Sequence, residues 1–386
     1  MGRGNIVKVV VAIDSFKGSM TSMEAGTAAK EGVLRVCDAK VVVKPLADGG
    51  EGTVDALVEG LGGRYHEVTV SGPLGLPVTA RYGILKDGRT AVMEMAEAAG
   101  ITLVKQEERD PWRASTTGVG EMILHALEEG CREFIVGIGG SATTEGGIGM
   151  LEALGYEFYD GEGKRLPPVL ESLGQIHRIS DAQVPVELKE CHFQIACDVK
   201  NPLCGENGAA AVFGPQKGVK PEEISGIDER MEYYARQTAL YTGKECSRIP
   251  GAGASGGLGF AFLSYFPNAD LKPGAEIVLA AIDLERELEN TDVVITGEGC
   301  LDAQTVMGKV PIGVAHLAKK YGCHVLAFAG GVTEDAGKCN KAGIDAFFPI
   351  VRGAMTLAEA MEPETAKKNM ALSVEQVFRI LNLSAT

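Results

Sequence analysis

The chain has 386 residues, 45% of them hydrophobic and 23% charged, and its formal net charge at pH 7 is −15. This composition predicts a globular protein with room for two domains, and the acidic excess argues against nucleic acid or an anionic membrane as a partner. Because no apolar stretch reaches the roughly 18 residues of a spanning helix and the first residues lack a signal-peptide core, we expect a cytoplasmic protein.

Two β-loop-α units open the chain. Residues 6–13 form an apolar, β-branched run typical of a strand buried on both faces of a parallel sheet. This strand ends in residues 14–18, after which Thr21 and Glu24 form a capping box that predicts the start of a helix. Residues 40–45 repeat the strand pattern, end in the glycine-rich segment 47–52 and lead into a second helix. The pattern predicts a parallel α/β sheet.

The hydrophobic period changes between residues 66 and 95, where alternating residues predict antiparallel hairpins. Hairpins fit poorly into a doubly wound sheet, so we predict an α/β fold in which a Rossmann-like parallel-sheet domain is interrupted by a second, smaller α/β domain. The predicted boundaries give residues 1–65, 114–190 and 288–386 to the Rossmann-like domain. Residues 66–113 and 191–287 then form the inserted domain.

A glycine-rich loop, Gly137 to Gly147, follows a predicted strand at Phe134 and precedes helical spacing. Its glycines allow a ligand to approach the backbone, and a helix that starts near Gly146 would offer free N–H groups to phosphate. The loop also satisfies the dinucleotide fingerprint G-x-G-x-x-A, with Asp160 at about the distance expected for a ribose-binding acid. A nicotinamide-dependent oxidoreductase of a small hydroxy acid is therefore an alternative.

Later segments end in polar loops of the same kind. Residues 193–197 predict a short strand that ends at Asp198, and residues 214–218 form a rigid loop with one cation, Lys217. Residues 292–296 predict another strand, which ends in the segment 297–305 and precedes a helix near Lys309.

Ligands of an open parallel sheet bind beyond the carboxyl ends of its strands. The polar side chains expected there are Asp14, Ser15, Lys17, Asp48, Glu51, Ser141, Thr143, Glu145, Thr296, Glu298, Asp302, Thr305 and Lys309. Carboxylates beside phosphate-binding glycines favour Mg²⁺, which takes one or two carboxylates together with phosphate oxygens. This combination indicates phosphoryl transfer, and a P-loop kinase is excluded because the sequence has no G-x-x-x-x-G-K-[ST] motif.

Six segments in fixed order resemble the type I glycerate kinases over nearly the whole chain. They are Ala12 to Lys17, Ala47 to Thr53, Gly137 to Thr143, Ala196 to Pro202, Gly214 to Gly218, and Thr296 to Thr305. The resemblance implies ATP-dependent phosphorylation of D-glycerate, usually at the 2-hydroxyl in bacterial members. The chain departs from the family's usual pattern at Glu145, where an aspartate is usual, and at Cys300, where an arginine is usual.

We therefore predict a kinase that uses ATP and Mg²⁺ on D-glycerate, as a monomer or homodimer. The predicted catalytic residues are Lys17, Asp48, Asp198 and Lys309, with Asp198 as the acceptor of the substrate proton. We assign ATP to Gly139, Gly140, Ser141, Thr143, Gly297 and Glu298, Mg²⁺ to Asp48, Glu298 and Asp302, and glycerate to Ser15, Arg113, Lys217 and Gln304.

Several alternatives to this prediction stay open. Arg113 or Lys217 would pair with the glycerate carboxylate, but Arg113 could instead pack against Trp112. Asp198 could instead begin an Asx turn. A non-catalytic binding protein for a small acid is the remaining functional alternative.

Overall fold

The structure, a computed structural model, describes residues 7–303, 305–307 and 309–383. The chain forms two compact units. The first comprises the segment that ends at Asp48, Asp55–Gly62, and the segment that starts at Ala275. The second comprises Gly49–Val54 and Gly63–Gly274 and is the larger of the two. The predicted class, a parallel-sheet domain interrupted by an α/β domain with antiparallel hairpins, is confirmed, but the inserted domain is the larger of the two and not the smaller, because residues 114–190 also pack in it.

The first unit is built on a five-stranded parallel sheet with the order β13-β12-β11-β1-β2. Its strands are β1 (Val7–Val11), β2 (Ala39–Val43), β11 (Val293–Leu301), β12 (His324–Val332) and β13 (Ala346–Pro349). Its helices are α1 (Ser22–Leu34), α2 (Thr53–Leu61), α9 (Gly274–Ala281), α10 (Leu284–Leu288), α11 (Val310–Lys320), α12 (Lys338–Lys341), α13 (Leu357–Met361) and α14 (Pro363–Leu383). The strand order reverses between β1 and β11, which is where such sheets bind ligands.

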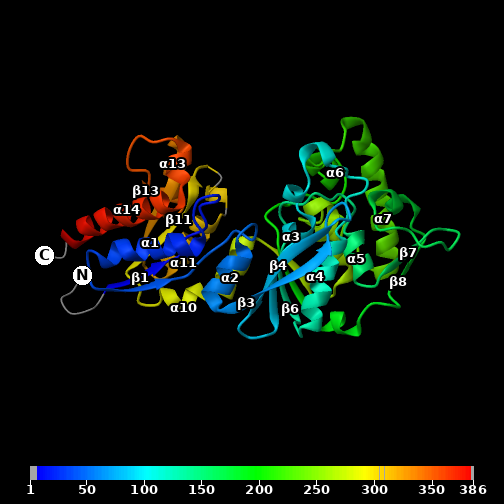
Figure 1. Cartoon of the computed structure of the whole chain (residues 1–386), viewed down its shortest axis with the longest axis horizontal. Coiled ribbons are helices and arrows are strands. Elements are labelled where there is room, and N and C mark those ends of the chain that lie inside the picture. Colours follow the sequence, from blue (N-terminus) through cyan, green and yellow to red (C-terminus); the bar gives the residue numbers. More distant parts are fainter. Residues whose placement is uncertain (1–6, 304, 308, 384–386) are drawn as a thin grey trace. The chain divides into compact units, whose positions relative to one another are not determined.

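Helices α1 and α14 lie side by side along this sheet (Figure 1). Helix α1 begins with the predicted capping box of Thr21 and Glu24. Its apolar face packs in one cluster with Val9 and Val11 of β1, both of which are fully buried. This packing fixes β1, and so it also fixes the loop that begins at Asp14.

The second unit is built on a six-stranded mixed sheet with the order β10-β9-β6-β5-β4-β3. Its strands are β3 (Gly63–Ser71), β4 (Pro77–Leu85), β5 (Thr90–Glu94), β6 (Glu133–Gly137), β9 (His192–Ala196) and β10 (Ala269–Lys272), and β7 (Glu157–Tyr159) pairs with β8 (Arg178–Ser180). Its helices are α3 (Ala96–Ala99), α4 (Thr117–Glu128), α5 (Ile148–Ala153), α6 (Ala209–Phe213), α7 (Ile224–Thr242) and α8 (Leu258–Tyr265). As predicted, β3, β4 and β5 form antiparallel hairpins.

The position of β6 explains why the two units differ from the predicted domain boundaries. Strand β6 pairs in parallel with β5 and β9, and the rings of Phe134 and Phe193 stack with centroids 4.8 Å apart. Residues 114–190 therefore pack in the second unit, not in the first. A buried apolar run predicts a strand but carries no signal of which sheet that strand joins.

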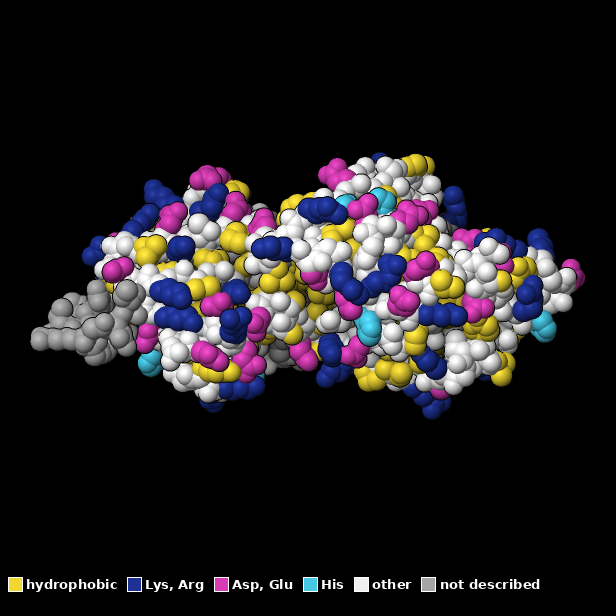
Figure 2. Space-filling model, turned by 90° about the horizontal axis from the view of Figure 1, so that it is seen from below, with side chains coloured by type: hydrophobic (Ala, Val, Ile, Leu, Met, Phe, Trp, Pro, Cys, Tyr) yellow, Lys and Arg dark blue, Asp and Glu magenta, His cyan; other side chains and the backbone are white. Residues whose placement is uncertain are grey.

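No helix in the described part of the chain is long and apolar enough to cross a membrane. On the face drawn in Figure 2, the Lys and Arg side chains are interspersed with Asp and Glu and form no continuous basic area.

Candidate active site

The first unit collects carboxylates at the carboxyl ends of β1, β2 and β11. Asp14 follows β1, Asp48 follows β2, and Glu298 lies in the last part of β11. Asp14 is only 5% exposed, and burial, with the negative charge of Asp48 and Glu298, raises its pKa to about 7, against the opposing effect of Lys17. A carboxyl group with such a pKa can take up and release a proton at neutral pH.

Each predicted catalytic lysine is paired with a predicted metal ligand. Lys17 Nζ lies 3.0 Å from Asp48 Oδ2, and Lys309 Nζ lies 3.4 Å from Glu298 Oε2. The lysine side chains are 52% and 39% exposed, respectively, so the lysine of each pair is open to solvent, whereas the Glu298 side chain is only 10% exposed. Such exposed pairs are held weakly, and an incoming phosphate or cation can separate them.

A hydrogen-bonded turn after β11 orients Glu298. The Thr305 hydroxyl donates to Glu298 Oε1 at 2.7 Å, and its oxygen accepts the N–H of Asp302 at 3.1 Å. Burial raises the pKa of Glu298, while the hydrogen bond from Thr305 and the charge of Lys309 oppose the shift. The predicted ligand Gln304 lies outside the described residues.

Backbone contacts hold the two remaining predicted residues of this unit. The N–H of Ser15 donates to Asp14 Oδ1 at 2.6 Å, and the carbonyl of Gly297 accepts the N–H of Asp14 at 3.0 Å. Ser15 and Gly297 thus frame Asp14 at the point where the strand order reverses.

These carboxylates fit a Mg²⁺ ion that is held in part by its substrate. In the described part of the chain, no three His, Cys, Asp or Glu side chains form a ready-made metal cluster. Mg²⁺ needs only one or two protein carboxylates when phosphate oxygens and water complete its shell. Repulsion from Asp48 and Glu298 contributes to the raised pKa of Asp14. A cation bound among these three carboxylates would reduce this repulsion.

The glycine loop after β6 lies in the second unit and has an open part and a packed part. Gly139 and Gly140 are exposed, and no atom lies within 4 Å of the place where a Cβ on Gly139 would be. At Gly146, by contrast, a Cβ would lie 2.7 Å from a ring carbon of Tyr234. Only the first part of the loop therefore presents free backbone to a ligand.

Helix α5 does not offer its N-terminus to phosphate, contrary to our expectation. Glu145, which is 1% exposed, accepts the N–H of Gly149 at 3.1 Å and the N–H of Thr116 at 3.1 Å. Burial raises the pKa of Glu145 to about 7, while these hydrogen bonds oppose the shift. The chain's own carboxylate thus occupies the place that we predicted for phosphate.

Lys217 lies beneath the same loop and is only 2% exposed. Its Nζ donates to Ser141 Oγ at 2.7 Å and to the carbonyl oxygen of Thr143 at 2.6 Å. Burial lowers its pKa to about 7, and the negative charge of Glu145 opposes that shift. A lysine buried in this way supports the loop and is not placed to pair directly with a substrate carboxylate.

Two other predicted residues occupy separate places in the second unit. Arg113 is exposed, and Trp112 is contacted instead by Arg230, whose guanidinium carbon lies 5.4 Å from a Trp112 ring centroid. Asp198 follows β9 and accepts the N–H of Gly274 at 3.0 Å.

The alternative prediction, a dinucleotide-binding oxidoreductase, requires Asp160 as the acid that binds the ribose. Asp160 Oδ1 accepts the N–H groups of Glu162 and Lys164, both at 2.9 Å, in the turn after β7. Asp160 therefore stabilises a turn, and the fingerprint lacks the ribose-binding acid that would make it specific.

The comparisons with known proteins agree with the strand-end chemistry. The family described as the glycerate kinase family matches residues 9–382. The chain belongs to this family. It is 45% identical over 357 residues to the glycerate kinase of Bacillus subtilis (strain 168), with 92% of this chain and 93% of that protein covered.

Two further relatives support the assignment. The glycerate 2-kinase of Escherichia coli (strain K12) is 44% identical over 355 residues, which cover 92% of this chain and 93% of that protein. A crystal structure of a protein provisionally named glycerate kinase 2, from Salmonella typhimurium LT2, has a TM-score of 0.91 and 42% identity and covers 99% of this chain and 100% of that one. The chain is therefore a kinase, as predicted.

For a glycerate kinase family member, two residues stand out that the sequence analysis left without a role. Asp14 directly follows a run of buried residues, Val9 to Ile13, and that position was the signal for its burial. Ser255 has a positive φ of 52°, and its hydroxyl donates to the carbonyl of Ile138 at the start of the glycine loop. No sequence motif singled out Ser255, because its role depends on contact between segments far apart in the chain.

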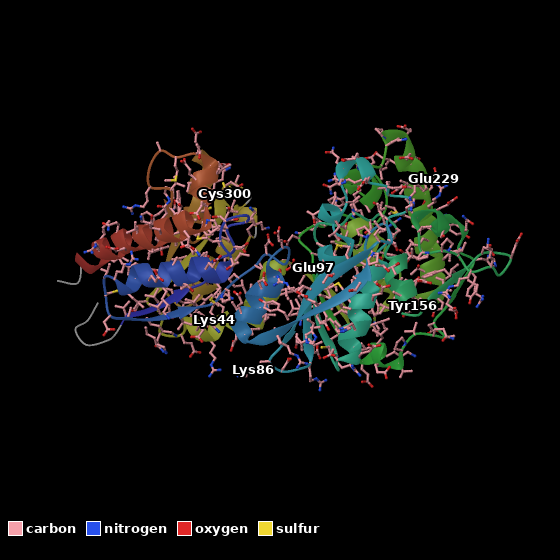
Figure 3. The ribbon with its side chains drawn as sticks, in the orientation of Figure 1. Lys44, Lys86, Glu97, Tyr156, Glu229 and Cys300 are labelled. Carbon is pink, nitrogen blue, oxygen red and sulfur yellow. The ribbon has the colours of Figure 1, made fainter. Side chains whose placement is uncertain are left out.

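Cys300, where the family usually has arginine, lies exposed in β11 (Figure 3). Partial burial and the charges of Asp302 and Glu298 raise the pKa of its thiol, and Lys309 opposes the shift. The environment is therefore acidic, as expected where a cation is missing from a group of carboxylates.

Proposed function

We propose that this kinase transfers the γ-phosphoryl group of ATP to D-glycerate, at the 2-hydroxyl. The observation that carries the proposal is a cluster of three carboxylates, Asp14, Asp48 and Glu298, where the strand order of the first sheet reverses. Lys17 and Lys309 are paired with Asp48 and Glu298 of this cluster. The position of transfer is supported by 44% identity to a protein named glycerate 2-kinase.

The two lysine pairs suggest how the first unit responds to its substrates. When bound, Mg²⁺ supplies positive charge to the transferring phosphoryl group. Asp48, with Glu298 or Asp302, would hold that ion, and Lys17 and Lys309 would then be released to phosphate oxygens. Each of the two lysines would thus exchange a carboxylate partner for a phosphate oxygen.

The substrate hydroxyl needs a group that accepts its proton as transfer proceeds. Asp198 and Asp14 are the two candidates. Asp14 has the stronger physical case, because it is buried and its pKa of about 7 lets it bind a proton at neutral pH. Asp198 already accepts a backbone hydrogen bond from Gly274.

The remaining residues that we predict to bind substrate fall into two groups, one for the phosphates of ATP and one for glycerate. Gly139 and Gly140 offer exposed backbone N–H groups to anionic oxygens, next to the hydroxyls of Ser141 and Thr143. The exposed guanidinium of Arg113 suits bidentate contact with the glycerate carboxylate, and Ser15 and Gln304 would bind its hydroxyls. Glycine and arginine thus supply neutral and charged donors for two different anions.

The test is direct. Purified protein is incubated with MgATP and D-glycerate, ADP is followed by a coupled assay, and ³¹P NMR distinguishes the 2-phosphate from the 3-phosphate. We expect ADP formation that requires D-glycerate and yields the 2-phosphate, with no reduction of NAD(P)⁺ in a parallel reaction. Folded protein that leaves D-glycerate unphosphorylated would overturn the proposal.

A further inference from the structure

The contacts of Lys217 carry an inference that rests on the proposed function and assigns a role within it. Lys217 ends a short 3-10 turn (Pro215–Lys217), and its ammonium lies under the glycine loop, where it reaches Ser141 Oγ and the Thr143 carbonyl. An ammonium group has only hydrogens to give. The Ser141 oxygen must therefore accept, and the hydroxyl hydrogen of Ser141 is left to donate elsewhere.

The charge of Lys217 is not balanced by a direct partner. Within the described residues Lys217 forms no ion pair, and Glu145, the nearest acidic influence, uses its two oxygens on the N–H groups of Thr116 and Gly149. A buried charge without a paired counterion destabilises the folded state. An anion that binds to the loop from the other side would supply the missing negative charge.

A second buried group in this loop also lacks a partner. The Thr143 hydroxyl is fully buried and makes no hydrogen bond to any described residue. It stands two residues after Ser141 and follows the exposed Gly139 and Gly140. The loop therefore brings together a hydroxyl without an acceptor, exposed glycine backbone and a buried cation. Groups of these kinds can donate hydrogen bonds and charge to an oxyanion.

We propose that Lys217 is a positioning residue: from beneath the loop it turns the Ser141 hydroxyl toward a substrate oxyanion, a phosphate of ATP or the carboxylate of glycerate, and supplies charge to that site. It does not touch the ligand. The chain of donation runs from Lys217 Nζ to Ser141 Oγ, and from the Ser141 hydroxyl to the anionic oxygen. No bond is made or broken in this arrangement.

The loop is held by other contacts, so changing Lys217 need not collapse it. Ala142 N–H donates to the carbonyl of Ala99 at 2.9 Å, and Gly146 N–H donates to the carbonyl of Gly256 at 2.9 Å. Ser255 holds the carbonyl of Ile138. We therefore expect a Lys217→Met chain, which keeps most of the side-chain volume, to fold.

The test measures binding, not turnover. Dissociation constants of ADP and of D-glycerate are measured by calorimetry for the full chain and for Lys217→Met, Ser141→Ala and the double variant. We expect Lys217→Met to weaken one of the two ligands about tenfold to a hundredfold, the range for a charge-assisted hydrogen bond. Ser141→Ala should weaken the same ligand, and the double variant should be little worse than Lys217→Met, because both changes break one chain of donation. The exposed Lys86, labelled in Figure 3, gives the matched control Lys86→Met, which should bind both ligands normally.

The pH dependence separates this role from simple support of the fold. Because an anion favours protonated Lys217, the affinity of the wild type should fall between pH 7.5 and 9, by at most about tenfold per pH unit. The charged groups around Lys217 are Glu145, whose pKa is about 7, and Arg109, which donates to the carbonyl of Gln216 and does not titrate in this range. In Lys217→Met the slope should disappear.

Two results would overturn the inference: a folded Lys217→Met chain with unchanged affinity for both ligands, or losses in the single variants that simply add. If Lys217→Met does not fold, Ser141→Ala decides alone, and unchanged binding of both ligands refutes the role. Failure of the proposed function would look different, because wild-type protein would then bind ADP without phosphorylating D-glycerate, and the ADP measurements would still test Lys217.

Discussion

The two units place charge at their strand ends in opposite ways. In the first unit, Lys17 and Lys309 reach carboxylates through exposed side chains. In the second unit, Lys217 is buried beneath backbone and reaches hydroxyl and carbonyl oxygens. The first arrangement can exchange partners when a ligand arrives. The second is fixed before the ligand arrives, as a preorganised electrostatic site requires.

This difference indicates a division of labour. The charge on a transferring phosphoryl group is redistributed during the reaction, and solvent-exposed pairs such as Lys17 with Asp48 can change partners as this happens. A spectator anion needs only to be held in place, and glycine N–H groups above Lys217 can hold it without rearrangement. Substitutions in the first unit should therefore affect kcat most, whereas those in the second should affect binding and stability.

The largest expected effect is on turnover, at the carboxylates of the first unit. Asp48→Asn and Asp302→Asn should each lower kcat about a hundredfold or more, because a hundredfold corresponds to about 2.7 kcal/mol of transition-state stabilisation. Asp38→Asn is the matched control: Asp38 is exposed and precedes β2, at the opposite end of the strand that leads to Asp48. Steady-state kinetics at saturating Mg²⁺ decide, and near-normal rates in both variants would remove these residues from the site.

The next effect concerns the stability of the same unit, at Asp14. Because its pKa is raised from 3.8 to about 7, the folded state keeps a proton that the unfolded state has already lost. Stability therefore falls as the pH rises from about 4 to about 7 and is level above that range. Asp14→Asn removes this penalty and still accepts the N–H of Ser15, so it should be more stable than the wild type at pH 8 by a few kcal/mol, since each pKa unit corresponds to about 1.4 kcal/mol.

Denaturant unfolding at several pH values checks this prediction. The gain in Asp14→Asn should shrink as the pH falls and vanish near pH 4, while kcat should be low throughout if Asp14 accepts the substrate proton. An Asp14→Asn chain that is less stable than the wild type at pH 8 would show that the Asp14 carboxylate is stabilised by its neighbours, contrary to the burial argument.

A smaller effect is expected in the second unit, at Glu145. Restoring the aspartate that is usual in the family shortens the arm that reaches the N–H groups of Thr116 and Gly149, both at 3.1 Å. Glu145→Asp should lose one of these hydrogen bonds and lower the free energy of unfolding by about 1–2 kcal/mol, with little change in kcat. Glu128→Asp, at an exposed position of α4, controls for the change of residue type. Equal melting temperatures for wild type and Glu145→Asp would mean that the backbone adjusts to the shorter side chain.

The sequence predicted which loops at strand ends carry polar residues, but it did not predict which of these loops lie at the same sheet. The motifs around Asp14, Asp48 and Glu298 do meet at one sheet, because parallel strands bring their carboxyl ends together. Ser141 and Lys217 belong to the second unit, and nothing in the pattern of residues 133–137 says which strands are the neighbours of β6. The burial of Lys217 was also hidden, since a lysine between glycines usually lies on the surface, and only the tertiary contacts reveal it.

The smallest expected effect returns to the first unit, at Cys300. All nine cysteines lie in the described part of the chain, and Cys300 is the only one of them that is exposed. Because burial and the charges of Asp302 and Glu298 raise the pKa of its thiol, alkylation should be slow at pH 7 and faster at alkaline pH. Peptide mass spectrometry after iodoacetamide treatment measures this rate, and rapid modification at pH 7 would contradict the acidic environment. MgATP with glycerate should protect the thiol if the loop binds them.

Cys300→Arg tests whether an arginine at this position changes the pairing of Lys309 with Glu298 and, through it, the binding of substrate. A guanidinium beside Asp302 and Glu298 would compete with Lys309 for Glu298, whose pair with Lys309 spans 3.4 Å. If Lys309 is thereby freed for phosphate, the KM for ATP should fall by a factor of about three, a fraction of a charge-assisted hydrogen bond, because the surrounding loop is not adapted to arginine. Cys300→Lys, a point charge without bidentate geometry, should give a smaller change. Unchanged KM values for ATP and glycerate in both variants would show that the exposed pairs of this unit do not limit substrate binding.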